Sequence, residues 1–466
     1  EIAAESLMWP LQFMTVRVSS TGNATTVTMH SGSWGTAPLF VSMNNGTLRG
    51  HWDARRLFPT LRSRKLNDTL VASELAGFGT PYSTRSVISD IRMLTERSTA
   101  TWRSSSTGAT RFSIAYPRAM PTQHPRRLRT DADVTATFQA ILESSMRRWL
   151  ATGADVVSEL SGGLDSAIVT GIAARIAGRG WNTCAINLLD SIECGQVARR
   201  GEMVRQWNCT DHTVQLEDAL PFGAAGSRAD DALVLPWEEC YYEAVDALLQ
   251  RVTRKAPVVM MTGFGGDELC TLLSTELPRP KKQPRGSAPE VAAGLPRFLS
   301  KRSRDAILDG EVESAPVGHT AESSVDCAAK GSALYMRRGA WPVHPLCTPE
   351  LVRFCASLPK EWRIDRTIER RVLQALGCSR RVTHGPSDSF SSAFILAVRS
   401  TARPLFEQLF TDSRLAAAGH VDGARLRREY KRWADGPGVE DGDSDGAFPF
   451  YSAAMLELTL RALERT

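Results

Sequence analysis

The stretch Ser161-Gly162-Gly163-Leu164-Asp165-Ser166 decides the fold of this chain. It directly follows the strand-like run 155–160 and opens a segment with the apolar stripe of a helix that packs on a sheet. The residues of that stripe are Ile168, Val169, Ile172 and Ile176, and the segment ends at Gly178 and Gly180. A glycine turn therefore meets the N-terminus of a helix at the end of a strand, which is a place suited to a phosphate chain.

The residues of this turn have the chemistry that phosphate needs. Gly162 and Gly163 lack a Cβ, so they can adopt the positive φ values that direct backbone N–H groups toward an anion. Ser161 and Ser166 add hydroxyl donors, and the helix dipole favours negative charge at the same point. Asp165 would repel phosphate unless a cation lay between them, so we interpret it as a ligand of Mg²⁺.

A second glycine turn follows another strand-like stretch. The apolar run 257–262 (PVVMMT) has the length of a buried strand, and Gly263-Phe264-Gly265-Gly266-Asp267-Glu268-Leu269 comes directly after it. Asp267 is therefore a candidate second carboxylate for the same cation.

Both turns resemble known signatures. The first is similar to the SGGxDS signature of the PP-loop ATP pyrophosphatases, which cleave ATP between its α and β phosphates. The second resembles the GxGxDE loop of the asparagine synthetase family, whose relatives include β-lactam synthetases and lasso peptide cyclases. The stretches 341–346 (WPVHPL), 350–354, 358–359 and 370–373 resemble the C-terminal helices of that family. Together the three resemblances extend from about Asp155 to Phe390, about half of the chain.

The resemblance implies an α/β fold with two domains. Residues 126–466 would form a PP-loop domain, a parallel sheet with flanking helices like that of the adenine nucleotide α-hydrolases. Residues 1–125 would form a mainly β domain similar to a degenerate glutaminase-type sandwich. The sequence agrees, because short alternating runs at 14–18 and 25–29 and the hairpin signal Asn44-Asn45-Gly46 predict antiparallel strands. The proline-rich, basic segment 117–129 marks the boundary.

The resemblance also implies ATP and Mg²⁺ as the nucleotide and the metal of the site. It assigns the metal to Asp165 and Asp267. The nucleotide contacts that it implies are Leu160, Ser161, Gly162, Gly163, Asp165, Ser166, Ile186 and Gly263. Leu160 and Ile186 would lie against the adenosine, although apolar residues are equally expected in buried strands.

Two features depart from the family. Phe264 stands where asparagine synthetases have Glu and β-lactam synthetases have Tyr, and it cannot act as a base; it would form a wall for a larger substrate or simply pack. The stretch 380–390 (RRVTHGPSDSF) has no lysine where the family places one to stabilise negative charge. Arg381 or Arg380 is a candidate replacement, and Arg370 is a second catalytic candidate, although arginines of this kind are more often surface charges than catalytic residues.

The composition is that of an ordinary globular protein, with 42% hydrophobic and 23% charged residues. A net charge of +5 is small for 466 residues and gives no indication of a nucleic-acid partner. Nine cysteines without a CxxC pair indicate reduced thiols and no zinc site. No signal peptide or membrane-length apolar run is present, so we expect a cytoplasmic protein without a membrane partner. His344 and His384 are candidate bases, for which we favour structural roles.

Three regions outside the motifs complete the interpretation. Glutaminase domains of the family begin with a nucleophilic cysteine after the initiator methionine, whereas this sequence begins Glu1-Ile2-Ala3 and its first cysteine is Cys184. Unless residues are missing, we therefore expect no glutamine hydrolysis. The basic stretch 277–304 is interpreted as a solvated loop or as a patch that grips an acidic substrate or peptide. We expect the acidic segment 436–446 to be a mobile loop.

These observations favour an enzyme, an AMP-forming carboxylate–amine ligase. It would adenylate a small-molecule or peptide carboxylate and capture it with an amine, as in lasso-type macrocyclisation of a precursor peptide with a leader-binding protein, or in a small-molecule pathway of specialised metabolism. The second hypothesis is an asparagine-synthetase-like amidotransferase that uses free ammonia. The third is a catalytically impaired nucleotide-binding scaffold, suggested by Phe264 and the missing lysine, although a scaffold has no need for both Asp165 and Asp267.

Overall fold

The structure is a computed structural model of the 466-residue chain. It describes residues 13–22, 24–32, 38–105, 107–121, 123–151, 153–178, 180–188, 195–223, 228, 234–273, 276, 294–310, 313–386, 388–436 and 446–466. The first residues, most of the basic stretch 277–304 and most of the acidic segment 436–446 lie outside these ranges, and so does Cys194. The predictions made for them stay predictions.

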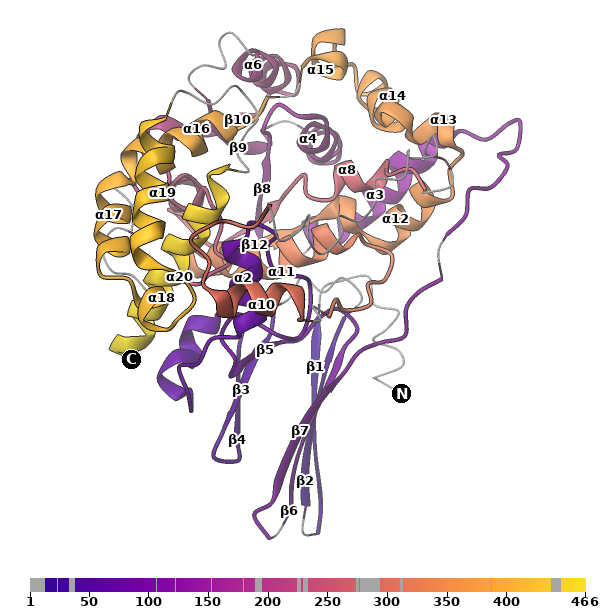
Figure 1. The fold of residues 1–466 in the computed structure, drawn as a ribbon. Coiled ribbons are helices and arrows are strands. Elements are labelled where there is room, and N and C mark those ends of the chain that lie inside the picture. The colour runs from indigo at the N-terminus through magenta and orange to yellow at the C-terminus, as the bar shows by residue number, and fades with distance from the viewer. Residues whose placement is uncertain are drawn as a thin grey trace.

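A five-stranded parallel sheet forms the centre of the larger part of the molecule (Figure 1). Its strand order is β10-β9-β8-β11-β12, and every neighbouring pair is parallel. The strands are β8 (Asp155–Glu159), β9 (Asn182–Asn187), β10 (Thr210–Gln215), β11 (Val258–Met261) and β12 (Ala340–Val343). The chain builds outward from β8 in one direction and then returns to build outward from β11 in the other. A topological switch point therefore lies between β8 and β11, where α/β sheets bind ligands at the carboxyl ends of their strands.

Helices cover both faces of this sheet, as the apolar strands require. Every residue of β11 is buried, which confirms the buried strand that the sequence predicts. One face packs against α3 (Val134–Leu150), α4 (Leu164–Ala177), α12 (Pro349–Ala356) and α14 (Thr367–Ala375). The other face packs against α7 (Tyr242–Val252) and α11 (Glu322–Arg337). The family-like α/β fold expected from the two motifs is thus confirmed.

Antiparallel sheets form the N-terminal part. Four strands pair in the order β1-β2-β6-β7, and three pair in the order β4-β3-β5. They are β1 (Met14–Thr21), β2 (Ala24–Ser31), β3 (Phe40–Asn44), β4 (Thr47–His51), β5 (Ile91–Met93), β6 (Thr99–Ser105) and β7 (Thr110–Ala115). The hairpin expected at Asn44-Asn45-Gly46 joins β3 to β4, with φ of 48° at Asn45 and 77° at Gly46. Met29, Val41 and Ala100 bury a small core between the two sheets.

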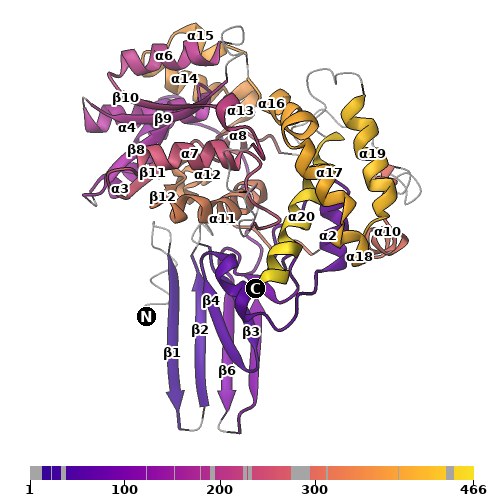
Figure 2. The same cartoon turned by 90° about the vertical axis from the view of Figure 1, so that its left-hand side faces the viewer.

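The N-terminal part shares a core with helices from the end of the chain. Helix α2 (Asp68–Leu75) packs on α10 (Lys301–Leu308) and on α20 (Phe448–Arg465), and Figure 2 shows α2, α10 and α20 side by side. One apolar cluster includes Phe40 and Leu57 together with Phe406 and Leu456. Further helices are α6 (Gln196–Gln206), α8 (Gly266–Leu269), α13 (Lys360–Arg363), α15 (Arg380–His384), α16 (Ser391–Leu396), α17 (Arg403–Thr411), α18 (Arg414–Ala417) and α19 (Gly423–Asp435). The domain boundary near Pro125 stays a prediction. Residues from both sides of this boundary contribute to the shared apolar cluster.

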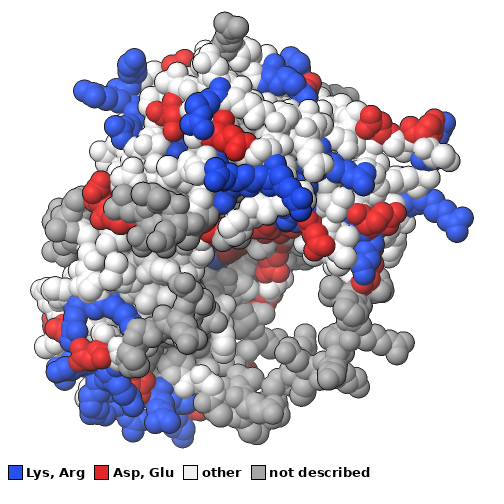
Figure 3. All heavy atoms as spheres, turned by 90° about the horizontal axis from the view of Figure 1, so that it is seen from above, with Lys and Arg blue, Asp and Glu red and all other residues white. Residues whose placement is uncertain are grey.

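The surface carries both signs of charge. Seen from above, Lys and Arg side chains form a band across the middle of the molecule, and Asp and Glu side chains lie beside it where the surface is hollowed (Figure 3). Within the described ranges, none of the helices is both long and apolar enough to cross a membrane. The cysteines that the structure describes are all free thiols, and most of them are buried.

Candidate active site

The two glycine turns lie side by side at the switch point of the parallel sheet. The first follows β8 and leads into α4, and the second follows β11 and leads into α8. Since β8 and β11 are hydrogen-bonded parallel neighbours, their carboxyl ends meet at the same edge of the sheet. The sequence placed both turns after strands, and the fold brings them together.

The first turn is closed by its own serines. Gly162 has a φ of +94°, a value that glycine adopts without strain. The hydroxyl oxygens of Ser161 and Ser166 are 2.9 Å apart, and the Ser166 hydroxyl accepts a hydrogen bond from the Ser161 N–H at 3.0 Å. Helix α4 begins after Gly163 without a capping side chain, so the N–H groups of its first turn are left to a ligand.

Glycines of the second turn allow the two loops to touch. A Cβ on Gly263 would lie 2.7 Å from the backbone nitrogen of Ser166, and one on Gly266 would lie 2.1 Å from Oδ1 of Asp165. Gly265 has a φ of +87°, and a Cβ there would lie 2.5 Å from the sulfur of Cys347. Only glycine therefore fits at positions 263, 265 and 266 without displacing neighbouring atoms, and the second loop lies directly against Asp165.

Arg366 links the carboxylates of both loops. Its guanidinium forms ion pairs with Asp165 and, at 2.6 Å, with Asp267. It also forms an ion pair with the fully buried Glu369 at 2.5 Å. Burial and the neighbouring Glu268 raise the pKa of Asp267. One cation therefore already lies between the two carboxylates that the sequence assigned to a metal.

The backbone holds Arg366 in this place at some cost. Asp365 and Arg366 have φ values of +51° and +57°, in the left-handed region that residues other than glycine rarely adopt. Helix α14 starts directly after them. Sequence reasoning missed Arg366, because its partners at 165 and 267 are distant in the chain and no glycine marks the left-handed turn.

The residues present fit a nucleotide. A cavity of about 650 Å³ lies over the first turn. Ser161, Gly162 and Gly163 line it together with three cationic side chains, Arg199, Arg366 and Arg370. Donor N–H groups, a side-chain-free cradle and arginines are the groups that bind a polyphosphate.

The residues also fit Mg²⁺. Asp165 and Asp267 supply oxygen ligands close enough to contact one guanidinium, and a magnesium ion needs only one or two carboxylates when phosphates complete its shell. The described residues contain no cluster of three or more metal-ligating side chains. A bound Mg²⁺ would neutralise the phosphates and polarise the α-phosphorus.

Leu160 and Ile186 lie below the first turn. Leu160 is fully buried in the core under α4, and its carbonyl accepts a hydrogen bond from Arg200. Ile186 is half-buried, and its carbonyl accepts from Nε2 of Gln196 at 3.1 Å. The same Nε2 donates to the carbonyl of Ser161 at 2.9 Å, so Gln196 ties β9 to the turn. Contact of Leu160 and Ile186 with adenosine stays a prediction.

The two arginines predicted to be catalytic lie in different places. Arg370 lines the nucleotide cavity, where it donates to the carbonyls of Asp365, at 2.7 Å, and Thr383. Arg381 is exposed on α15 and is not among the described residues that line this cavity. The structure thus brings Arg370 to the site together with Arg366 and Arg199, which the sequence analysis did not select.

Phe264 is an exposed wall between two cavities. Its side chain is 37% exposed and lines a cavity of about 330 Å³ between the two loops, as well as a larger one beside them. Its ring lies edge-on to His344, at 5.4 Å between centroids. His344 is buried, and this burial lowers the pKa of its imidazole to about 4. His344 is therefore neutral near pH 7 and is not a cation of the site.

A carboxylate of the cavity between the two loops is hydrogen-bonded to a phenol. Glu159, the last residue of β8, lines this cavity, and Oε1 accepts a hydrogen bond of 2.8 Å from the hydroxyl of Tyr335 on α11. Burial raises the pKa of Glu159 to about 7. A carboxylate with such a pKa can take up a proton near neutral pH. Glu159 lies only two residues before the first turn, yet no sequence pattern marked it.

Fold and site together define an α/β protein with paired glycine loops at the switch point of its parallel sheet. The sequence profile of the family described as asparagine synthase matches residues 137–316 and 320–461. The chain belongs to the asparagine synthase family, whose members are ATP-dependent amide ligases. No match is found among curated protein sequences.

Solved structures give only distant likenesses. The U34-tRNA thiolase NcsA from Methanococcus maripaludis is 14% identical over 70% of this chain and 88% of that chain, with a TM-score of 0.30. The NMN synthetase from Francisella tularensis is 12% identical over 50% and 94%, with a TM-score of 0.22. The NH3-dependent NAD synthetase from Campylobacter jejuni is 11% identical over 66% and 98%, also with a TM-score of 0.22. TM-scores this low add nothing to the family match.

Proposed function

We propose that this protein is an ATP-dependent ligase that adenylates a carboxylate and joins it to an amine. The observation that carries the proposal is the meeting of the two glycine loops, with Asp165 and Asp267 held by one guanidinium at the switch point of the sheet. Family membership supports the ligase chemistry.

The proposed reaction has two steps. A carboxylate oxygen attacks the α-phosphorus of ATP, the bond to the β-phosphate breaks, and pyrophosphate leaves. The amine nitrogen then attacks the acyl carbon, AMP leaves, and the nitrogen loses a proton. The backbone N–H groups of the first turn and the side chains of Arg199, Arg366 and Arg370 would bind the phosphates and balance the charge that develops on them.

The proton of the amine needs an acceptor, which Phe264 cannot be. Glu159 is the residue we propose, because it lines the cavity between the loops and is oriented by the hydroxyl of Tyr335. Its pKa of about 7 suits a general base at neutral pH.

Two classes of carboxylate and amine substrate fit the proposed reaction. Peptide macrocyclisation with a precursor peptide and a leader-binding protein, and ligation of small molecules, both follow from the family resemblance. A cavity of about 500 Å³ beside Phe264 favours small-molecule ligation, since volumes of this size hold drug-sized molecules.

The proposal is tested by measuring pyrophosphate release from ATP and Mg²⁺ with a panel of amino acids, dicarboxylates and aryl acids, each with hydroxylamine as the trapping amine. We expect pyrophosphate and a hydroxamate with at least one acid, and loss of both in Asp165→Asn. The exposed Glu361→Gln variant on α13 serves as the matched control and should keep wild-type rates. Binding of ATP without pyrophosphate from any acid would favour the nucleotide-binding scaffold instead.

A further inference from the structure

A second large cavity adjoins the proposed active site. Its volume is about 500 Å³, and its walls come from α2, α11, α20 and the segment 236–240. Phe264 lines both this second large cavity and the small cavity between the glycine loops. Asp165 lines both the small cavity and the nucleotide cavity. The three cavities therefore adjoin one another, and the second large cavity borders the loops where the acyl group would be activated.

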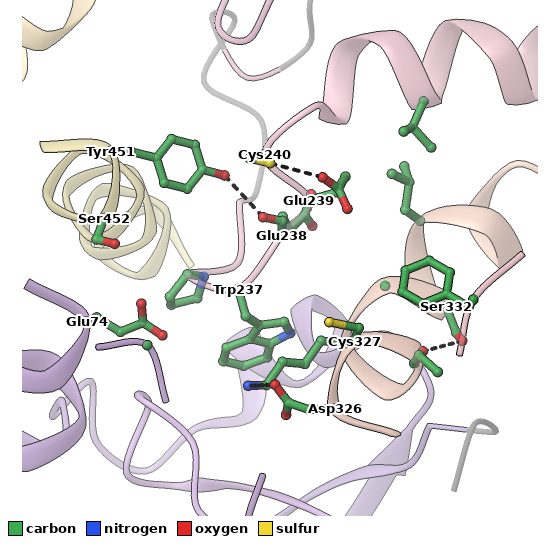
Figure 4. Close-up of a pocket in the computed structure, with 18 of the residues that line it drawn as sticks. Glu74, Trp237, Glu238, Glu239, Cys240, Asp326, Cys327, Ser332, Tyr451 and Ser452 are labelled. Carbon is green, nitrogen blue, oxygen red and sulfur yellow. Dashed lines mark hydrogen bonds and ion pairs between the residues drawn. The ribbon is translucent and has the colours of Figure 1, made fainter. Parts of the chain in front are cut away.

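The lining of this cavity is acidic. Four carboxylates, those of Glu74, Glu238, Glu239 and Asp326, face one lysine, Lys330. In Figure 4, Glu74 lies on one side of Trp237 and Asp326 on the other, with Glu238 and Glu239 above them. We name it the acidic cavity after these four residues.

Two of the four carboxylates are paired and two are not. Asp326 forms an ion pair with Lys330 at 2.7 Å, and Glu238 forms one with Arg337 at 3.1 Å. Within the described part of the chain, Glu74 and Glu239 form no ion pair. Glu239 accepts hydrogen bonds only from uncharged groups, the thiol of Cys240 and the backbone N–H of Tyr241, both at 3.2 Å. Glu74 lies near Lys330 and forms side-chain hydrogen bonds with Thr80 and Ser452, but burial outweighs these contacts and raises its pKa. A cationic ligand would compensate the charge of Glu239 and would favour the ionised form of Glu74.

Aromatic and unpartnered polar groups complete the lining. Trp237, Phe264, Tyr335 and Phe448 supply aromatic surface, which suits an apolar body and attracts cations. His344 is only 3% exposed, and its Nε2 atom has no hydrogen-bond partner in the structure. A buried ring nitrogen without a partner is costly unless a ligand satisfies it.

Glu239 lies near the proposed proton acceptor. Its negative charge contributes to the raised pKa values of Glu159 and Tyr335. An ammonium group held by Glu239 would therefore lie close to the pair that would take its proton, and the apolar body attached to it would extend along Trp237 toward Glu74.

We propose that the acidic cavity binds the amine substrate, a small organic ammonium ion with an alkyl or aromatic body, through Glu239 with support from Glu74. This assignment rests on the proposed ligase function, since it names the amine that the ligase would use. It accounts for the two unpaired carboxylates, the aromatic walls and the contact with Phe264.

The test compares amines with neutral molecules of the same shape, in the absence of ATP. The probes are tryptamine, phenylethylamine and cadaverine, each paired with the alcohol that has a hydroxyl in place of the ammonium group. Binding to the full chain is measured by calorimetry and by the fluorescence of Trp237, using a Trp237→Phe variant to identify its signal. We expect the amines to bind about tenfold to hundredfold more tightly than their alcohols, as expected for a charge-assisted contact in a partly desolvated site.

Variants then locate the contact. Glu239→Gln should abolish the preference for amines, Glu74→Gln should reduce it, and the exposed Glu361→Gln should leave it unchanged. Equal binding of amines and alcohols by the wild type, no binding of any probe at millimolar concentration, or a preference retained in Glu239→Gln would each overturn the assignment. The wild-type comparison decides even if a variant does not fold. The binding test contains no ATP and the pyrophosphate assay is run separately, so the two proposals can fail independently. Amine binding in the first, with no pyrophosphate from any acid in the second, would count against the ligase and leave the cation site intact.

Discussion

Gly266→Ala is the substitution that tests the contact between the two loops most sharply. The new Cβ would lie 2.1 Å from Oδ1, 2.2 Å from Cγ and 2.7 Å from Cβ of Asp165, all well inside contact distance. Since the atoms in conflict belong to a side chain, Asp165 must move by about 1 Å or more to restore normal contact. That movement pulls the carboxylate away from Arg366 and from the place where it would bind Mg²⁺. A misplacement of this size costs about 100-fold in rate, and the overpacking costs about 1–3 kcal/mol of stability.

The assay for Gly266→Ala is substrate-dependent pyrophosphate release, with chemical denaturation run in parallel. Gly294→Ala is the matched control, because a Cβ at Gly294 meets nothing within 4 Å. We expect the control to keep wild-type rates while Gly266→Ala loses most of its activity and stays folded. Wild-type rates in Gly266→Ala would refute the claim that the second loop positions Asp165.

Three further predictions concern charged and titratable groups. Arg366→Gln should lower the free energy of unfolding by about 2–4 kcal/mol, because it leaves the fully buried Glu369 without its cation; denaturant titration checks this, and an unchanged midpoint would contradict it. Burial lowers the pKa of His344 to about 4 in the folded protein, whereas the unfolded chain has the usual histidine pKa of about 6.5. The unfolded state therefore binds a proton first as the pH falls, and the free energy of unfolding should drop by up to about 3 kcal/mol between pH values of about 6.5 and about 4. Melting curves across this range test it, with His344→Gln expected to be flatter; a wild-type profile as flat as that of the variant would argue against a buried neutral imidazole. Arg228→Met should lower the free energy of unfolding by about 3–5 kcal/mol, since Arg228 is 1% exposed and forms an ion pair with Glu243. The double variant Arg228→Met with Glu243→Gln should lose less stability, because no buried charge is left without a partner. Equal losses in the single and double variants would contradict a stabilising role of the ion pair.

The sequence predicted the secondary structure that depends on neighbouring residues. The strand before Ser161, the helix after it, the buried strand 258–261 and the hairpin at Asn45-Gly46 all follow from glycine, β-branched and apolar periodicity. That both turns share one edge of the sheet follows from parallel pairing of the strands that precede them. The strands, the helix and the hairpin need no knowledge of distant parts of the chain, whereas the shared edge depends on the pairing of β8 with β11.

Features that depend on distant parts of the chain escaped the sequence analysis. Arg366 reaches Asp165 and Asp267 only after α14 packs under α4, and its left-handed backbone has no glycine to announce it. Arg381 matched the position of the missing lysine but is exposed on α15. The acidic cavity joins residues from α2 to α20, almost the whole length of the chain, so no local pattern could show it.

The proposed function requires the adenylyl group of ATP to be transferred to the substrate carboxylate, with pyrophosphate as the leaving group. The measurement that tests it most directly uses the acid with the largest pyrophosphate release, labelled with oxygen-18 in its carboxylate, and follows the label by mass spectrometry. Our account predicts that the AMP formed carries one labelled oxygen and that pyrophosphate carries none. Formation of ADP with labelled inorganic phosphate, or of AMP without label, would contradict it.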